Sequence, residues 1–144
     1  MYYDEEIDPQ ILKPYFKRSE LSASDGSFKL ASGFAEKLVQ LRIAYGKPMT
    51  ITSGCRTKDD IKRLIDRGYQ ASSNSFHLID NPQWNTGGCC AIDVAWPIEK
   101  RSAYELIREA SKLDWNIRIA PFRFIHLDRR KDYTELKSEL DFYK

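Results

Sequence analysis

Hydrophobic and polar residues alternate along this chain with two different periods. Where apolar residues recur every three or four positions, as Phe34, Leu38 and Leu41 do, the pattern predicts a helix with one buried face. Helices are expected on this basis at residues 9–16, 32–48, 57–68, 102–114 and 133–143. Short apolar or β-branched runs predict strands at residues 49–54, 90–96, 116–120 and 123–128.

Capping residues mark the start of two of these helices. Thr57 followed by Asp60, and Ser102 followed by Glu105, have the spacing of a capping box. Helices come early in the chain and strands gather later, without strict alternation of strand and helix. This order favours an α+β fold, with helices packed on a small, mostly antiparallel sheet.

Length and charge narrow the range of functions. A chain of 144 residues fits a single domain, 1–144, whose first thirty residues we expect to form a loose N-terminal arm. Its 23 basic and 21 acidic residues nearly balance, and the basic run Arg129–Lys131 is most simply a solvated turn, so no nucleic-acid partner is expected. No apolar run approaches the roughly 18 residues of a membrane span. The acidic N-terminus does not resemble a signal peptide, so we expect a cytoplasmic monomer with no membrane partner.

The three cysteines do not predict a disulfide framework. Their number is odd, and Cys89 and Cys90 are adjacent, although a bridge from Cys55 to either remains open. We expect three reduced, buried thiols. A Cys90–His77 nucleophilic dyad, or Cys89 as an additional metal ligand, is a weaker alternative.

The chain has two histidines, and both lie in informative places. His77 is at the edge of a long polar loop, and His126 lies in a predicted strand with Asp128 two residues later, on the same face. Asp93 falls inside another predicted strand, where a buried carboxylate requires a partner. Two imidazoles and a carboxylate would form a three-ligand metal site, and three protein ligands leave the fourth position of zinc open for water, as in catalytic sites.

Four short motifs, in this order, resemble the zinc D-alanyl-D-alanine peptidase family, which includes VanX-type dipeptidases, phage endolysin peptidases and the hedgehog signalling domain. The motifs are SGCR (53–56), SFH (75–77), AID (91–93) and FIHLD (124–128). The resemblance extends over residues 38–128 and implies that family's fold, in which helices pack on an antiparallel sheet.

The resemblance also implies a role for each matching residue. His77, Asp93 and His126 match the Zn²⁺ ligands, Arg56 matches the arginine that binds substrate and polarises its carbonyl, and Ser75 matches a substrate-binding serine. The implied activity is hydrolysis of peptidoglycan stem peptides by zinc-bound hydroxide, as a D-Ala-D-Ala carboxypeptidase or an endolysin-type endopeptidase. The implied setting is a phage-encoded enzyme that other factors release to the cell wall, or a virion component.

One departure from the family pattern concerns spacing. Asp93 follows His77 by sixteen residues, whereas the family places its aspartate seven residues after the first histidine. Residues 79–87 would therefore form an insertion that could shape the substrate cleft, with Trp84 as a lid or anchor. Such an insertion costs only about 1 kcal/mol in loop closure.

The second departure concerns the general base. Many family members carry an acidic residue three positions before the last histidine, where this chain has Arg123. Asp128 is then the candidate catalytic base, or alternatively a partner that orients His126. This departure motivates an alternative function, a non-catalytic zinc-binding module or a phage structural or interaction module on the same fold.

Overall fold

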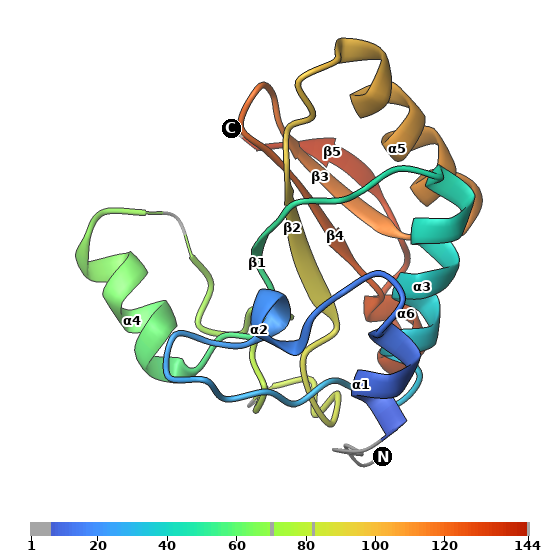
Figure 1. The fold of residues 1–144 in the computed structure, drawn as a ribbon. Helices are drawn as coiled ribbons and strands as arrows, with labels where there is room; N and C mark the ends of the chain where they lie inside the picture. Colours follow the sequence, from blue (N-terminus) through green and yellow to red (C-terminus); the bar gives the residue numbers. More distant parts are fainter. Residues whose placement is uncertain (1–6, 70, 82, 144) are drawn as a thin grey trace.

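The computed structural model describes residues 7–69, 71–81 and 83–143 (Figure 1). Its helices are α1 (Ile7–Leu12), α2 (Arg18–Leu21), α3 (Phe34–Tyr45), α4 (Lys58–Asp66), α5 (Lys100–Lys112) and α6 (Arg130–Tyr133). Its strands are β1 (Ile51–Ser53), β2 (Ala91–Ala95), β3 (Asn116–Ala120), β4 (Phe124–Asp128) and β5 (Leu140–Phe142). The predicted α+β class is confirmed. Within the described ranges, no helix has the length and apolar character needed to cross a membrane.

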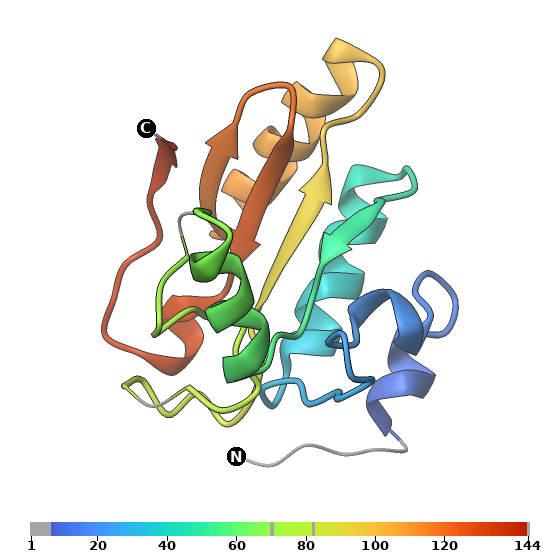
Figure 2. The ribbon, with the colours of Figure 1, turned by 90° about the vertical axis from the view of Figure 1, so that its left-hand side faces the viewer.

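The strands form one mixed sheet in the order β1-β2-β4-β3-β5. All neighbouring strands pair antiparallel except β3 and β5, which are parallel. Helices α3 and α5 lie against one face of the sheet, while α4 and the segment that follows it stand on the side of the opposite face (Figures 1 and 2). The sheet therefore has one face buried against helices and one face that is partly open.

Side-chain alternation along the central strands separates the apolar core from the polar residues. Six alternate strand residues join the core formed with α3 and α5: Ile92, Val94, Ile117, Ile119, Ile125 and Leu127. The residues between them point to the other face because successive side chains of a strand alternate. The register places Asp93, His126 and Arg118 side by side there.

The N-terminal segment corrects one prediction. Residues 7–30 are not a loose arm, because Leu12, Phe16, Leu21 and Leu30 are buried in the main core. Residues 1–6 of the predicted arm lie outside the described part of the chain. Helix α1 overlaps the helix predicted at residues 9–16, but no local pattern indicates that this segment packs into the main core.

The C-terminal helix predicted over residues 133–143 is also wrong. Helix α6 ends at Tyr133, where the Thr134 hydroxyl binds the Arg130 carbonyl oxygen and accepts the Leu136 amide, which gives the backbone partners other than the next helical turn. Strand β5 then pairs with the free edge of β3. This long-range pairing overrides the local helical pattern.

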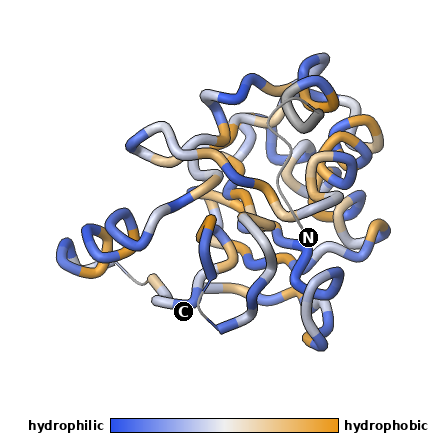
Figure 3. Tube along the Cα trace, turned by 90° about the horizontal axis from the view of Figure 1, so that it is seen from below, coloured by the Kyte–Doolittle hydropathy of each residue, from blue (hydrophilic) through white to orange (hydrophobic). Residues whose placement is uncertain are grey.

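The two predicted capping boxes had different outcomes. Thr57 and Asp60 cap α4 reciprocally, through hydrogen bonds of 3.1 and 2.9 Å. The second box is wrong, because α5 begins at Lys100 and both Ser102 and Glu105 lie within it. Their side chains instead accept hydrogen bonds from Lys47 Nζ at 2.9 and 2.7 Å, and a cationic donor is a stronger partner than a backbone amide. Helix α4 carries mostly hydrophilic residues and projects from the rest of the chain (Figure 3).

The basic run Arg129–Lys131 is not a solvated turn. Arg129 is only 3% exposed, and its guanidinium donates to the Leu113 carbonyl oxygen and to Asp132. Arg130 pairs with Asp128. The run therefore fixes the start of α6 against the sheet instead of facing solvent.

Candidate metal centre

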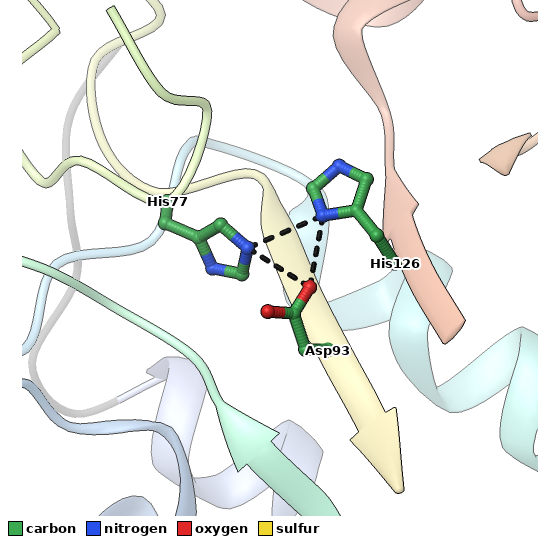
Figure 4. A group of neighbouring side chains, drawn as sticks. All are labelled: His77, Asp93 and His126. Carbon is green, nitrogen blue, oxygen red and sulfur yellow. Dashed lines mark hydrogen bonds and ion pairs between the residues drawn. The ribbon is translucent and has the colours of Figure 1, made fainter. Parts of the chain in front are cut away.

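Three side chains from distant parts of the sequence converge on the open face of the sheet. His77 comes from the segment between α4 and β2, Asp93 from β2 and His126 from β4 (Figure 4). His77 Nε2 lies 3.2 Å from Asp93 Oδ1 and 3.3 Å from His126 Nδ1, and His126 Nδ1 lies 2.9 Å from Asp93 Oδ1. All three residues are buried, and their ligand atoms are close enough together to hold one metal ion. We call His77, Asp93 and His126 the metal group.

The outer partners of the two imidazoles define which ring nitrogens carry protons. His77 Nδ1 lies 2.7 Å from the Gly54 carbonyl oxygen, and His126 Nε2 lies 2.8 Å from Asp128 Oδ2. Both partners are acceptors, so these nitrogens donate. In the neutral rings, His77 Nε2 and His126 Nδ1 then carry lone pairs that face each other and Asp93.

His77 Nε2, His126 Nδ1 and Asp93 Oδ1 are all acceptors, so their close approach requires a positive charge between them. Burial lowers the pKa of His77, which favours the neutral imidazole that binds metals. Burial also lowers the pKa of His126, but hydrogen bonds to Asp128 and Asp93 outweigh it and raise this pKa to about 9. Burial raises the pKa of Asp93, yet the two histidines hold it well below its usual range. The site therefore holds an ionised carboxylate and favours a cation, either a proton on His126 or a metal ion.

Arg56 lies next to this group, as the sequence predicts. Its Nη2 atom is 3.2 Å from Asp93 Oδ2, which leaves Oδ1 directed at the two histidines. The backbone of Arg56 is joined to the His77 segment by two hydrogen bonds, Arg56 N to His77 O and Ile79 N to Arg56 O. These bonds fix the arginine and the first histidine relative to each other.

Gly54 allows this close packing of the arginine turn. A Cβ atom at this position would lie 2.7 Å from the Leu21 Cα and carbonyl oxygen atoms, closer than real Cβ contacts. The absence of a side chain lets the turn rest on α2, with its carbonyl oxygen aimed at His77 Nδ1. The glycine of the SGCR motif thus has a packing role beside the metal group.

The Ser75 side chain contacts the backbone of His77, not its imidazole. Its Oγ accepts the His77 backbone amide at 3.1 Å, which holds the turn that presents the histidine. Ser75 also lines the cleft described below, so both a structural role and the predicted substrate contact fit its position.

Asp128 lies on the far side of the His126 ring from the three ligand atoms. It is fully buried and accepts hydrogen bonds from His126, Arg130 and Asn116. A carboxylate enclosed in this way orients His126 and raises its basicity, as outer partners of metal-binding histidines do. This position favours the orienting role over that of a general base.

A cleft of about 1160 Å³ opens over the metal group. Gln83 and Trp84, from the predicted insertion, form part of its wall, and the Trp84 ring stacks on Phe76 with centroids 6.2 Å apart. The insertion therefore shapes the cleft, as expected. Pro82, within it, lies outside the described residues.

The cysteines take no part in the site. All three are free and buried, which confirms the prediction of reduced thiols. Burial raises the pKa of the Cys90 thiol well above its usual range, and it raises that of Cys89 likewise, so neither is a ready thiolate. The residues that converge are the predicted metal ligands His77, Asp93 and His126, without a cysteine.

Sequence reasoning missed the residues that support the ligands. Asn116, Arg118 and Arg130 all lie close to His126 or Asp128. Alternation along residues 116–120 places Asn116 and Arg118 on one face, but the sequence does not show which strand lies alongside. Arg130 was assigned to a solvated turn, and no local signal marked its partner.

Fold and site together define an α+β domain with a buried group of two histidines and one carboxylate that could hold a metal ion. No protein-family model, no curated protein and no solved structure matches the chain. Conclusions about function therefore rest on the chemistry of the site and on the motifs.

Proposed function

We propose that this chain is a zinc-dependent peptidase that hydrolyses an amide bond in peptidoglycan stem peptides, as a relative of the zinc D-alanyl-D-alanine peptidases that its motifs resemble. The observation that carries the proposal is the convergence of His77 Nε2, His126 Nδ1 and Asp93 Oδ1 within 3.3 Å of one another, at the base of a cleft. Two imidazoles and one carboxylate are a donor set of catalytic zinc sites.

Each nearby residue has a distinct part in the proposed reaction. Zinc in such a site lowers the pKa of a bound water and polarises a carbonyl group. Arg56 is placed to pair with a substrate carboxylate or to stabilise the negative charge that develops on the carbonyl oxygen, because its guanidinium lines the cleft beside Asp93. Asp128 holds His126 in the tautomer that binds metal.

A second candidate is a non-catalytic zinc-binding module on the same fold. Among the described residues that line the cleft, Asp93 is the only carboxylate, and Arg123 stands where family members carry their acidic base. With Asp128 enclosed behind His126, no second carboxylate faces the proposed substrate. This observation specifically favours a role in binding or in phage structure.

Turnover and metal content separate the two candidates. The purified protein, loaded with zinc, is incubated with peptidoglycan and with soluble stem peptides, and products are identified by mass spectrometry. One equivalent of zinc by metal analysis, with release of D-alanine or cleavage of a stem peptide, supports the peptidase. His77→Ala should abolish both results, whereas Asp114→Asn, on the surface, should change neither.

The remaining outcomes are equally informative. One equivalent of zinc with no cleavage of any stem peptide supports the non-catalytic module. Iron in place of zinc contradicts both candidates, because two histidines and one carboxylate also form the iron(II) site of oxygenases.

A further inference from the structure

The cleft over the metal group is strongly cationic. Its described lining includes four arginines, Arg56, Arg118, Arg123 and Arg130, but one carboxylate, Asp93. Arg56 is paired with Asp93, and Arg130 forms a two-pronged pair with Asp128. These pairings leave Arg118 and Arg123, neither of which is paired with a carboxylate of the described cleft lining.

Arg118 has an incompletely satisfied guanidinium. Its Nε atom is buried and has no hydrogen-bond partner among the described residues. The same Nε atom forms an ion pair with Asp141 Oδ1 at 3.6 Å, longer than a hydrogen bond, and the two side chains are 42% and 55% exposed, so water screens this contact. A buried donor without a hydrogen bond is costly in a folded protein, and a bound anion is one of the arrangements that would satisfy it.

The guanidinium of Arg118 is also held in place. It lies 4.2 Å from the centre of the Tyr143 ring, and this ring packs against Phe124 at 5.3 Å. The Tyr143 amide donates to the Ile119 carbonyl oxygen on β3, which fixes the aromatic ring to the sheet. An arginine held on an aromatic ring loses little side-chain entropy when it binds an anion.

Arg118 and Arg56 lie on opposite sides of the metal group. Arg118 on β3 is the cross-strand neighbour of His126, whereas Arg56 contacts Asp93 from the β1 side of β2. Two strand spacings, roughly 10 Å, separate the backbones of β2 and β3, and this is the length of about three residues of an extended peptide.

We propose that Arg118, assisted by Arg123 at the turn before β4, forms a second anion subsite, and that the cleft binds an acidic peptide with one carboxylate at Arg56 and another at Arg118. Arg123 adds positive charge without an ion-pair partner among the described residues, and its guanidinium packs over Phe124. This inference rests on the proposed peptidase function for the position of the scissile amide, between the two carboxylates.

Four matched peptides test the subsite in the zinc-loaded protein. The parent is acetyl-Glu-Ala-D-Ala-D-Ala with a ketomethylene group in place of the last amide, which prevents hydrolysis. The others replace Glu by Gln, the terminal carboxylate by an amide, or both. Isothermal titration calorimetry should show about tenfold weaker binding when Glu becomes Gln, because a charge-assisted pair is lost.

Protein variants test whether Arg118 causes the tenfold difference in binding between the Glu and Gln peptides. In Arg118→Gln the Glu and Gln peptides should bind within twofold of each other. Asp141→Asn removes the competing carboxylate and should strengthen binding of the Glu peptide by two- to fivefold, a gain that misfolding cannot produce. Arg101→Gln makes the same charge change on α5, where the side chain is 89% exposed, and should leave the tenfold factor intact.

Several results would overturn the subsite. Equal binding of the Glu and Gln peptides to the wild-type protein would do so, as would a tenfold factor that persists in Arg118→Gln. A phosphoserine peptide that binds more tightly than the Glu peptide through Arg118 would refute the carboxylate assignment. The same Glu and Gln peptides with an ordinary amide in place of the ketomethylene group test hydrolysis. Their hydrolysis without discrimination between Glu and Gln would leave the peptidase proposal standing and refute the subsite. Tighter binding of the Glu peptide than of the Gln peptide, with hydrolysis of neither, would refute the peptidase proposal and leave the subsite standing.

Discussion

Replacing Asp128 by asparagine tests how the metal group is oriented. Every group around this carboxylate is a donor: His126 Nε2 at 2.8 Å, three groups of Arg130 at 2.8–3.0 Å and Asn116 Nδ2 at 3.1 Å. Asparagine keeps the shape but turns one acceptor oxygen into an NH₂ group. On the Oδ1 side that group would face two Arg130 donors, and on the Oδ2 side it would face His126 Nε2, Arg130 Nη2 and Asn116 Nδ2.

Neither orientation keeps every donor paired. In the Oδ2 orientation His126 Nε2 can pair with the NH₂ group only by becoming an acceptor, while Arg130 Nη2 and Asn116 Nδ2 stay opposed to it. The ring proton then moves to Nδ1, where it occupies the lone pair directed at Asp93 and at the metal position. We expect zinc affinity to fall by about 10- to 100-fold, the usual effect of losing such an outer partner. We also expect a loss of about 3 kcal/mol in the free energy of unfolding, because Arg130 loses its buried ionic partner.

Zinc affinity can be measured by competition with a chromophoric chelator, and stability by urea unfolding of the metal-free protein. Asp114→Asn is the matched control: Asp114 is 56% exposed, pairs with Lys131 and has a positive φ of 66°, a conformation that asparagine tolerates. It should change neither quantity appreciably. Wild-type zinc affinity in Asp128→Asn would show that Asp128 does not set the His126 tautomer, or that His126 is not a ligand.

Three further predictions follow from the same structure. His77→Ala should reduce bound zinc from one equivalent to background, as measured by metal analysis of the purified protein, and unchanged zinc content would remove His77 from the ligand set. Gly54→Ala should destabilise the fold by at least about 2 kcal/mol in urea unfolding and also weaken zinc binding, since the new Cβ would lie 2.7 Å from Leu21 and displace the carbonyl oxygen that binds His77. Burial raises the pKa of Asp60, but hydrogen bonds from Ser24, Thr57 and Arg63 outweigh it and lower this pKa to about 2 from an ordinary value of 3.8. The stability that Asp60 contributes is therefore complete above about pH 4 and lost as the pH falls through about 2, so the difference in unfolding free energy between wild type and Asp60→Asn should shrink over that range. A difference that stays constant would contradict the lowered pKa.

Local sequence patterns were sufficient to predict most of the helices and strands. Helical periodicity and glycine stop signals located α3, and the reciprocal Thr57–Asp60 cap marked the start of α4. These signals act between residues near in sequence, so they can be recognised without the fold. The predicted C-terminal helix was wrong because the local preference of residues 133–143 competes with an unpaired edge of β3, and only the folded sheet presents that edge.

The three residues that could hold a metal ion were predictable for a similar reason. Each sits in a short motif, and the alternation along a strand places His126 and Asp128 on one face whatever their neighbours are. The motif spacing also predicted that residues 79–87 loop out between His77 and Asp93 and shape the cleft, and Trp84 of that loop does line it.

The sequence by itself determined which residue types could bind a metal and that His126 and Asp128 share one face of a strand. Only the tertiary structure decided the cross-strand order Asp93, His126, Arg118, which sets Arg118 beside the metal group, and the burial of Asp128 against Arg130. Strand register and the pairing of charges depend on contacts between segments far apart in the chain, and such contacts leave no periodic trace in the sequence. The roles of Asp128 and Arg118 therefore became visible only in the fold.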